Sequence, residues 1–148
     1  FGSGRDAEAA IPGAAEEFLV RFDKEIKQSL VELCSASTNL AVLDIMFTLN
    51  GRHSRVVSVA IDILSKRLKE AGFYTHVYKF DEIHMRVTVF SSFEGKITEE
   101  NRVSPNMPDD KREQIHGGLR LMIEWNKEKQ DYVARQWGVI WSPLAFLR

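Results

Sequence analysis

Cysteine is nearly absent from this chain of 148 residues, in which Cys34 is the single example. One cysteine excludes an internal disulfide framework, and we interpret Cys34 as a small apolar residue on a helix. Secreted domains often depend on disulfides, whereas intracellular proteins keep their thiols reduced. We therefore expect an intracellular protein.

Long apolar runs and a marked excess of one charge are also missing. No segment approaches the roughly 20 apolar residues that a membrane-spanning helix needs, so we expect no membrane insertion. Lysine and arginine number 20 against 21 acidic residues, which gives a net charge of −1. This balance argues against strong non-specific binding to nucleic acid, although residues 51–90 hold seven bases and only four acids.

The motifs of common catalytic and metal sites are lacking as well. The chain contains no His-Glu-x-x-His, Gly-x-Ser-x-Gly or Cys-x-x-Cys motif and no glycine-rich phosphate loop. Its four histidines are irregularly spaced, with no pair four residues apart. We therefore expect no metal and no cofactor, and the sequence favours a protein that is not an enzyme.

The composition that remains is that of one globular domain. Hydrophobic residues make up 44% of the chain, and a domain of this length buries roughly two-thirds of the surface of its unfolded chain. We expect residues 11–148 to form this domain. Residues 1–10 are expected to be disordered or vector-derived, because Phe1–Gly4 resembles a linker and Arg5–Ala10 is polar and rich in alanine.

The clearest pattern lies in residues 41–90. Apolar residues alternate along Ala41–Leu49, which predicts a strand with one buried face and one face partly exposed to water. Arg52–Ala71 has apolar residues at helical spacing, and Gly72 follows as the residue that ends the helix. Phe73–Phe80 and Ile83–Phe90 then predict a β-hairpin.

The register of this hairpin can be argued from its turn. If Asp81 and Glu82 form a two-residue turn, apolar and polar residues fall on opposite faces, and such segregation normally sets the register. Lys79, His84 and Arg86 then share the polar face, while the tyrosines of the first strand lie on the other. The predicted cationic face therefore lacks aromatic residues.

Further elements are predicted on both sides of this unit. Apolar residues recur every three or four positions up to Leu33, which predicts an amphipathic N-terminal helix. Leu119–Trp125 alternates and predicts a fourth strand. For Asn126–Trp137 we predict a helix with Asn126 at its N-cap. The alternative is a second hairpin, because apolar residues also alternate there.

Together these elements predict an α+β fold. We expect a two-layer sandwich in which two main helices cover one face of a mainly antiparallel four-stranded sheet. The predicted order of elements is α-β-α-β-β-β-α.

Two segments outside the predicted core favour a function in protein interaction. Residues 91–116 form a long, proline-containing segment without periodicity, and such loops are usually functional or disordered. The C-terminal residues are rich in aromatic side chains. Our first hypothesis is a non-enzymatic interaction or assembly domain that binds a protein partner or a second copy. Its candidate interface residues are Phe93, Ile97, Val103, Met107, Trp137, Trp141 and Phe146.

The alternative hypothesis is a nucleic-acid-binding module that contacts phosphates through the strand-to-helix corner at residues 51–55. Free backbone N–H groups at the start of a helix favour anions, and neighbouring arginines add charge. The candidate contact residues at the corner and on the hairpin are Arg52, His53, Arg55, Lys79, His84 and Arg86. The sequence leaves partner identity and oligomeric state open.

Overall fold

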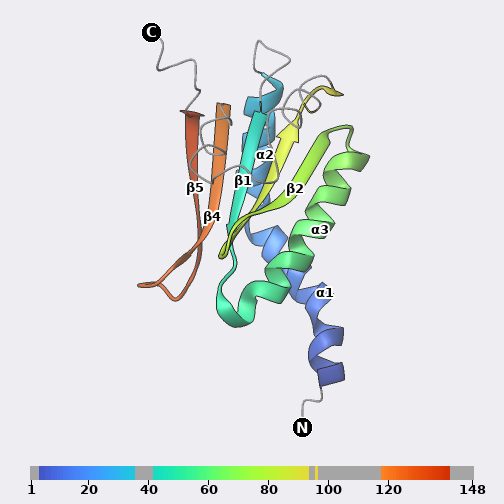
Figure 1. The fold of residues 1–148 in the computed structure, drawn as a ribbon, viewed down its shortest axis with the longest axis vertical. Coiled ribbons are helices and arrows are strands. Elements are labelled where there is room, and N and C mark those ends of the chain that lie inside the picture. The colour runs from blue at the N-terminus through green and yellow to red at the C-terminus, as the bar shows by residue number, and fades with distance from the viewer. Residues whose placement is uncertain (1–3, 36–41, 94–95, 97–117, 141–148) are drawn as a thin grey trace.

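The computed structural model describes residues 4–35, 42–93, 96 and 118–140, and Figure 1 shows how they are arranged. The α-helices are α1 (Gly4–Arg21), α2 (Asp23–Cys34) and α3 (Ser54–Glu70), and the short 3-10 helix η1 (Gly51–His53) precedes α3. The strands are β1 (Val42–Thr48), β2 (Tyr74–Asp81), β3 (His84–Phe90), β4 (Gly118–Asn126) and β5 (Asp131–Ile140). The predicted α+β class is confirmed, and α3 and β1 to β4 lie where the sequence placed a helix and strands.

The five strands form one mixed sheet in the order β2-β3-β1-β4-β5. Three of the four strand pairings are antiparallel, as predicted, but the sheet has five strands instead of four, and β1 pairs parallel with β4. The reason is topological. β3 ends beside the first residue of β1, so the two lie at the same end of the sheet. A strand that starts at that end beside β1 must run parallel to β1.

The N-terminal helical region contains two helices instead of the predicted one. A break at Phe22, which has φ −110° and ψ 11°, separates α1 from α2. Phe22 is buried and packs edge-on against Phe18, with ring centres 5.2 Å apart, so the break lies against the core. α1 begins at Gly4 and therefore includes residues 4–10, which were expected to be disordered or vector-derived.

The segment after β4 is a strand, so the predicted helix over Asn126–Trp137 is wrong and the second hairpin is right. The Asn126 side-chain oxygen accepts a hydrogen bond from the backbone N–H of Lys129 at 2.8 Å, and Gln130 adopts a positive φ of 51°. These features form a turn, and Tyr132 then enters the core. Burial of Tyr132 and the pairing of β5 with β4 thus outweigh the helix propensity of this stretch.

All three described helices contribute to one hydrophobic core, which lies between them and the sheet. Leu43, Ile45 and Phe47 of β1 are fully buried in it. The opposite face of β1 is also buried, since Asp44 is 2% exposed and Met46 only 5%. The expectation of a partly exposed second face is therefore wrong, because side chains of β3 and β4 pack around these residues. Thr88 and Arg120 contact Asp44, and Arg86 contacts Met46.

The β2–β3 hairpin is shifted by one residue from the predicted register. Tyr78 lies opposite Arg86 and Lys79 opposite Met85, with an irregularity between Lys79 and Asp81. The Asp81 carboxylate accepts a hydrogen bond from the backbone N–H of Ile83 at 2.9 Å, which moves the turn one residue along the chain. Because side chains alternate between faces, this shift places the aromatic residues of β2 on the same face as Arg86.

Candidate functional site

The outer face of the sheet, opposite the helices, carries a line of rings along the edge strand β2. We call Tyr74, His76, Tyr78 and Phe80 the aromatic row. Every second residue of an edge strand thus presents a ring on one face. The rings of His76 and Tyr78 lie 5.1 Å apart, and Phe93 continues the row with its ring 5.5 Å from that of Tyr74.

Arg86 holds two members of the aromatic row in place. Its guanidinium carbon lies 4.3 Å from the centre of the Phe80 ring, and its Nη1 donates a hydrogen bond to the Tyr78 hydroxyl at 2.9 Å. The Arg86 side chain is fully buried, so the stacking is shielded from water. Two ring positions are therefore fixed by a cation beneath them.

A buried polar network surrounds this arginine. Thr88 donates a hydrogen bond to Asp44 at 3.3 Å, and the Arg120 guanidinium lies 3.7 Å from the same carboxylate. Burial raises the pKa of Tyr78 to about 12, because desolvation disfavours the phenolate more than the nearby Arg86 favours it. Tyr78 is therefore neutral at physiological pH.

The cations predicted on the hairpin do not lie together on one exposed face. Lys79 pairs with Glu82 at 3.7 Å, and His84 Nδ1 lies 2.8 Å from the carboxylate of Asp81. Burial alone would raise the pKa of Asp81, but hydrogen bonds from the Ile83 N–H and from His84 outweigh it and lower that pKa. Arg86, the third predicted cation, is buried beneath the rings.

The strand-to-helix corner at residues 51–55 retains the features on which the predicted phosphate contact depends. No side chain caps the start of α3, and the first turn of that helix contains no acidic residue. Arg52 and Arg55 are exposed, and Arg55 lies 3.8 Å from Glu8 of α1. His53 instead points into a pocket between α1, the start of α3 and β5.

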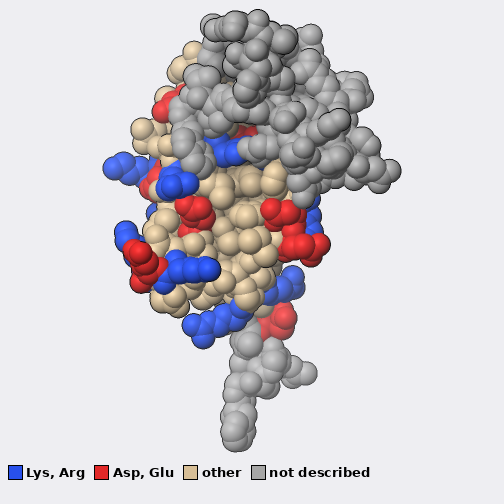
Figure 2. All heavy atoms as spheres, turned by 60° about the vertical axis from the view of Figure 1, so that its left-hand side comes forward, with Lys and Arg blue, Asp and Glu red and all other residues tan. Residues whose placement is uncertain are grey.

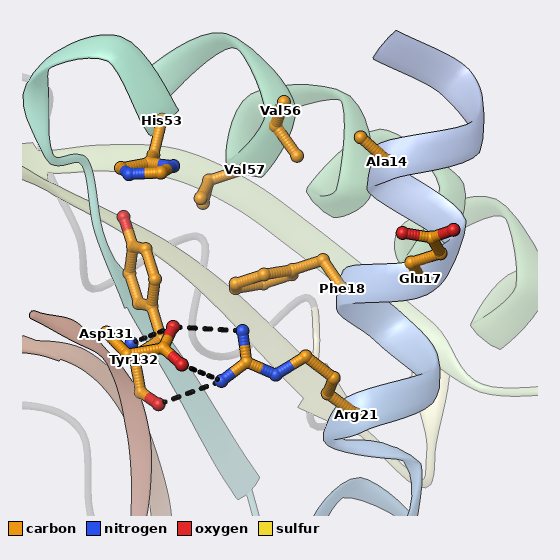
Figure 3. A pocket seen from close by; sticks show the side chains of 9 residues that line it. All are labelled: Ala14, Glu17, Phe18, Arg21, His53, Val56, Val57, Asp131 and Tyr132. Atoms are coloured by element: carbon orange, nitrogen blue, oxygen red, sulfur yellow. Dashed lines mark hydrogen bonds and ion pairs between the residues drawn. The ribbon is translucent and has the colours of Figure 1, made fainter. Parts of the chain in front are cut away.

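Figure 3 shows this pocket, which has a volume of about 220 Å³. Arg21 forms a double hydrogen bond with Asp131 at 3.0 Å, and this contact lowers the pKa of the Asp131 carboxyl. His53 stacks on Trp125 with ring centres 5.1 Å apart. Small-molecule sites typically measure about 300–1,000 Å³, so this pocket is smaller than a typical ligand site. We therefore interpret these contacts as packing interactions that hold α1 against β5. The lining residues are Ala14, Glu17, Phe18, Arg21, His53, Val56, Val57, Asp131 and Tyr132.

Of the predicted interface residues, Phe93 is described and is 56% exposed beside Tyr74. The backbone of Trp137 lies in β5, but its side chain is not described. Ile97, Val103, Met107, Trp141 and Phe146 lie outside the described residues. The aromatic row is what the sequence analysis missed. The alternation of rings in residues 74–80 was visible, but the register assigned it to the buried face.

Charges of both signs are interspersed around a largely uncharged surface on the β5 side of the molecule, as Figure 2 shows. Among the described residues, no group of three or more histidine, cysteine or acidic side chains is placed to hold a metal ion. None of the described helices is long and apolar enough to cross a membrane.

Comparison of the chain with protein-family models, curated proteins and solved structures found no match.

Proposed function

We propose that the protein is a non-enzymatic interaction domain that binds a protein partner through the edge of β2. The observation that carries the proposal is the aromatic row, which stands on an edge strand and is continued by the exposed Phe93. The edge of a sheet presents backbone N–H and C=O groups to which another strand can bind. Aromatic rings beside that edge supply a large contact area at low entropic cost.

The rigid support of the row favours this function. Arg86 stacks under Phe80 and donates to Tyr78, so these two rings need little further ordering when a partner arrives. Contacts that are organised before binding retain more of their favourable free energy.

The charges near the row favour a protein over a nucleic acid. Lys79 is paired with Glu82 and His84 with Asp81, while Arg86 is buried. Phosphate contacts dominate the affinity of nucleic-acid-binding proteins and need accessible cations. The net charge of −1 gives no general attraction to compensate.

Site-specific photo-crosslinking tests this proposal. A photoreactive amino acid replaces Phe93 in the full chain, and the protein is irradiated in extract of the cells that produce it. We expect covalent capture of protein, reduced by Tyr74→Ala, because Tyr74 contacts Phe93 at the end of the row. The matched control carries the same probe at Val20, which is 73% exposed on α1. Equal capture at both positions would contradict the proposal.

A second candidate function is phosphate contact by nucleic acid at the corner of residues 51–55. It is favoured by the uncapped, acid-free start of α3 beside the exposed Arg52 and Arg55. The same photoreactive probe at Arg52 should then capture an oligonucleotide, and the yield should fall steeply as salt rises. Absence of oligonucleotide capture at low salt would reject this candidate.

A further inference from the structure

We infer that the partner of the aromatic row is a second copy of this chain, which pairs with it antiparallel through β2 about a two-fold axis at Val77. The inference rests on the proposed function and names the partner of the same surface. It comes from the arrangement of side chains along one strand. Two-fold pairing sets each residue of β2 opposite the residue of the partner's β2 that lies equally far on the other side of the axis, so the strand must be complementary to itself.

The outer face of β2 meets this condition. With Val77 opposite the partner's Val77, Tyr74 lies opposite the partner's Phe80 and His76 opposite the partner's Tyr78. Directly opposite residues of antiparallel strands share a face, with Cβ atoms roughly 4.5–5.5 Å apart. All four rings of each copy therefore meet a ring of the other, and aromatic cross-strand pairs are among the stabilising ones.

The other face and the competing registers support the same arrangement. Lys79 lies opposite the partner's Thr75, so no like charges face each other directly. A shift of two residues in one direction leaves Phe80 without an opposite residue in the partner's strand, and a shift in the other direction leaves Tyr74 without one. A shift of one residue sets the outer face of one copy against the helix-covered face of the other.

The length of β2 bounds the strength of the contact. Eight residues of strand edge form a smaller contact than the interfaces of stable complexes, which bury about 1,200–2,000 Å². We therefore expect a reversible dimer whose population rises with protein concentration. Pairing would join two five-stranded sheets into one continuous sheet.

Charge variants of His76 test the register. In this arrangement His76 and the partner's His76 are diagonal neighbours, roughly 7–8 Å apart. His76→Glu and His76→Lys each place like charges at these positions, so each should weaken dimerisation, by roughly fivefold for a repulsion near 1 kcal/mol. An equal mixture of the two variants should recover dimers in sedimentation velocity, because opposite charges then meet. Val20→Glu, on α1, should change nothing.

A second variant keeps the inference testable if the charge variants unfold. Val77→Cys in a Cys34→Ser background is a mild change at the two-fold axis and should give a disulfide-linked dimer on gentle oxidation. The control is Ile83→Cys in the same background, at an exposed position in the hairpin turn. Preferential linkage at position 77 supports the inference, whereas equal linkage at both positions overturns it.

The two proposals fail differently. A chain that stays monomeric at all concentrations, with no recovery in the mixture of charge variants, overturns pairing with a second copy. If the probe at Phe93 then captures a different protein, the proposed interaction function stands with another partner. If that probe captures no protein, the interaction function fails as well.

Discussion

At the scale of single residues, the outer face of the sheet depends on a buried charge. Arg86 is 0% exposed, yet its guanidinium lies over Phe80 and donates to Tyr78. A buried cation is costly unless hydrogen bonds and nearby negative groups compensate for lost hydration. Asp44, 2% exposed on the same face, supplies negative charge to this network. Truncating Arg86 would therefore disturb both the sheet face and two rings of the aromatic row.

Tyr78 should report this environment in an alkaline titration. Its pKa is raised to about 12, against about 10 for a tyrosine in an unfolded chain. The folded state thus holds this proton more tightly, so its contribution to stability is complete below about pH 10 and is lost as pH rises towards 12. Tyrosinate absorbance should show a step near pH 12 that Tyr78→Phe removes. A high-pH step that persists in the variant would contradict the assignment.

The sequence was enough to predict the conformation or exposure of some residues, but it was not enough to predict the burial of others. Gly72 was expected to end the helix, and α3 does end at Glu70, with Gly72 following at a left-handed φ of 98°. The corner at Arg52 and Arg55 is exposed, and no side chain caps the helix that follows. The burial of Arg86 could not be foreseen, because it depends on strands that are distant in sequence.

At the scale of elements, one turn decided what the sequence could predict about the candidate site. Asp81 and Glu82 were taken as the turn, but the Asp81 side chain bonds to the N–H of Ile83 and the turn moves by one residue. A shift of one residue moves every side chain of a strand to the other face. The existence of the hairpin was therefore predictable from local pattern, whereas the face that carries the rings was not.

The limit of local sequence pattern also explains why the helix predicted after β4 was wrong. Asn126 fitted both a helix N-cap and a turn, and the residues that follow combine helix propensity with alternation. The outcome was set by pairing with β4, where Met122 lies opposite Arg135 and Trp125 opposite Tyr132. Local sequence cannot weigh such tertiary contacts against propensity.

The pairing of β4 with β1 makes a prediction about Gly118. Its φ is 108°, and a Cβ atom there would lie 2.5 Å from the backbone carbonyl oxygen of Val42. Gly118→Ala should therefore lower the free energy of unfolding by about 2–4 kcal/mol, through backbone strain and displacement of β1. Urea denaturation measures the change.

Gly13 provides the control for this substitution. It lies inside α1, and a Cβ atom there would meet nothing within 4 Å. Gly13→Ala should stabilise the protein by about 0.5–1 kcal/mol, because alanine favours the helix. If both alanine variants changed stability equally, the close approach of Gly118 to Val42 would be wrong.

At the scale of the whole molecule, the α+β class followed from periodicity alone, but the sheet order did not. Burial of the helix stripes and of alternate strand residues predicts two layers. The parallel pairing of β1 with β4 arises from where β3 ends, which no local pattern records. The same topology leaves β2 at the edge of the five-stranded sheet and so creates the surface on which the proposed function depends.

Amide hydrogen exchange along β2 at rising protein concentration tests the central claim most directly. Roughly half of the amides of an edge strand point away from the sheet and exchange readily unless another strand covers them. If β2 pairs with a second copy, amides within Tyr74–Phe80 should exchange more slowly as concentration increases, and His76→Glu should abolish this effect. Amides of the central strand β1 should not respond. Exchange along β2 that is the same at every concentration would contradict the claim.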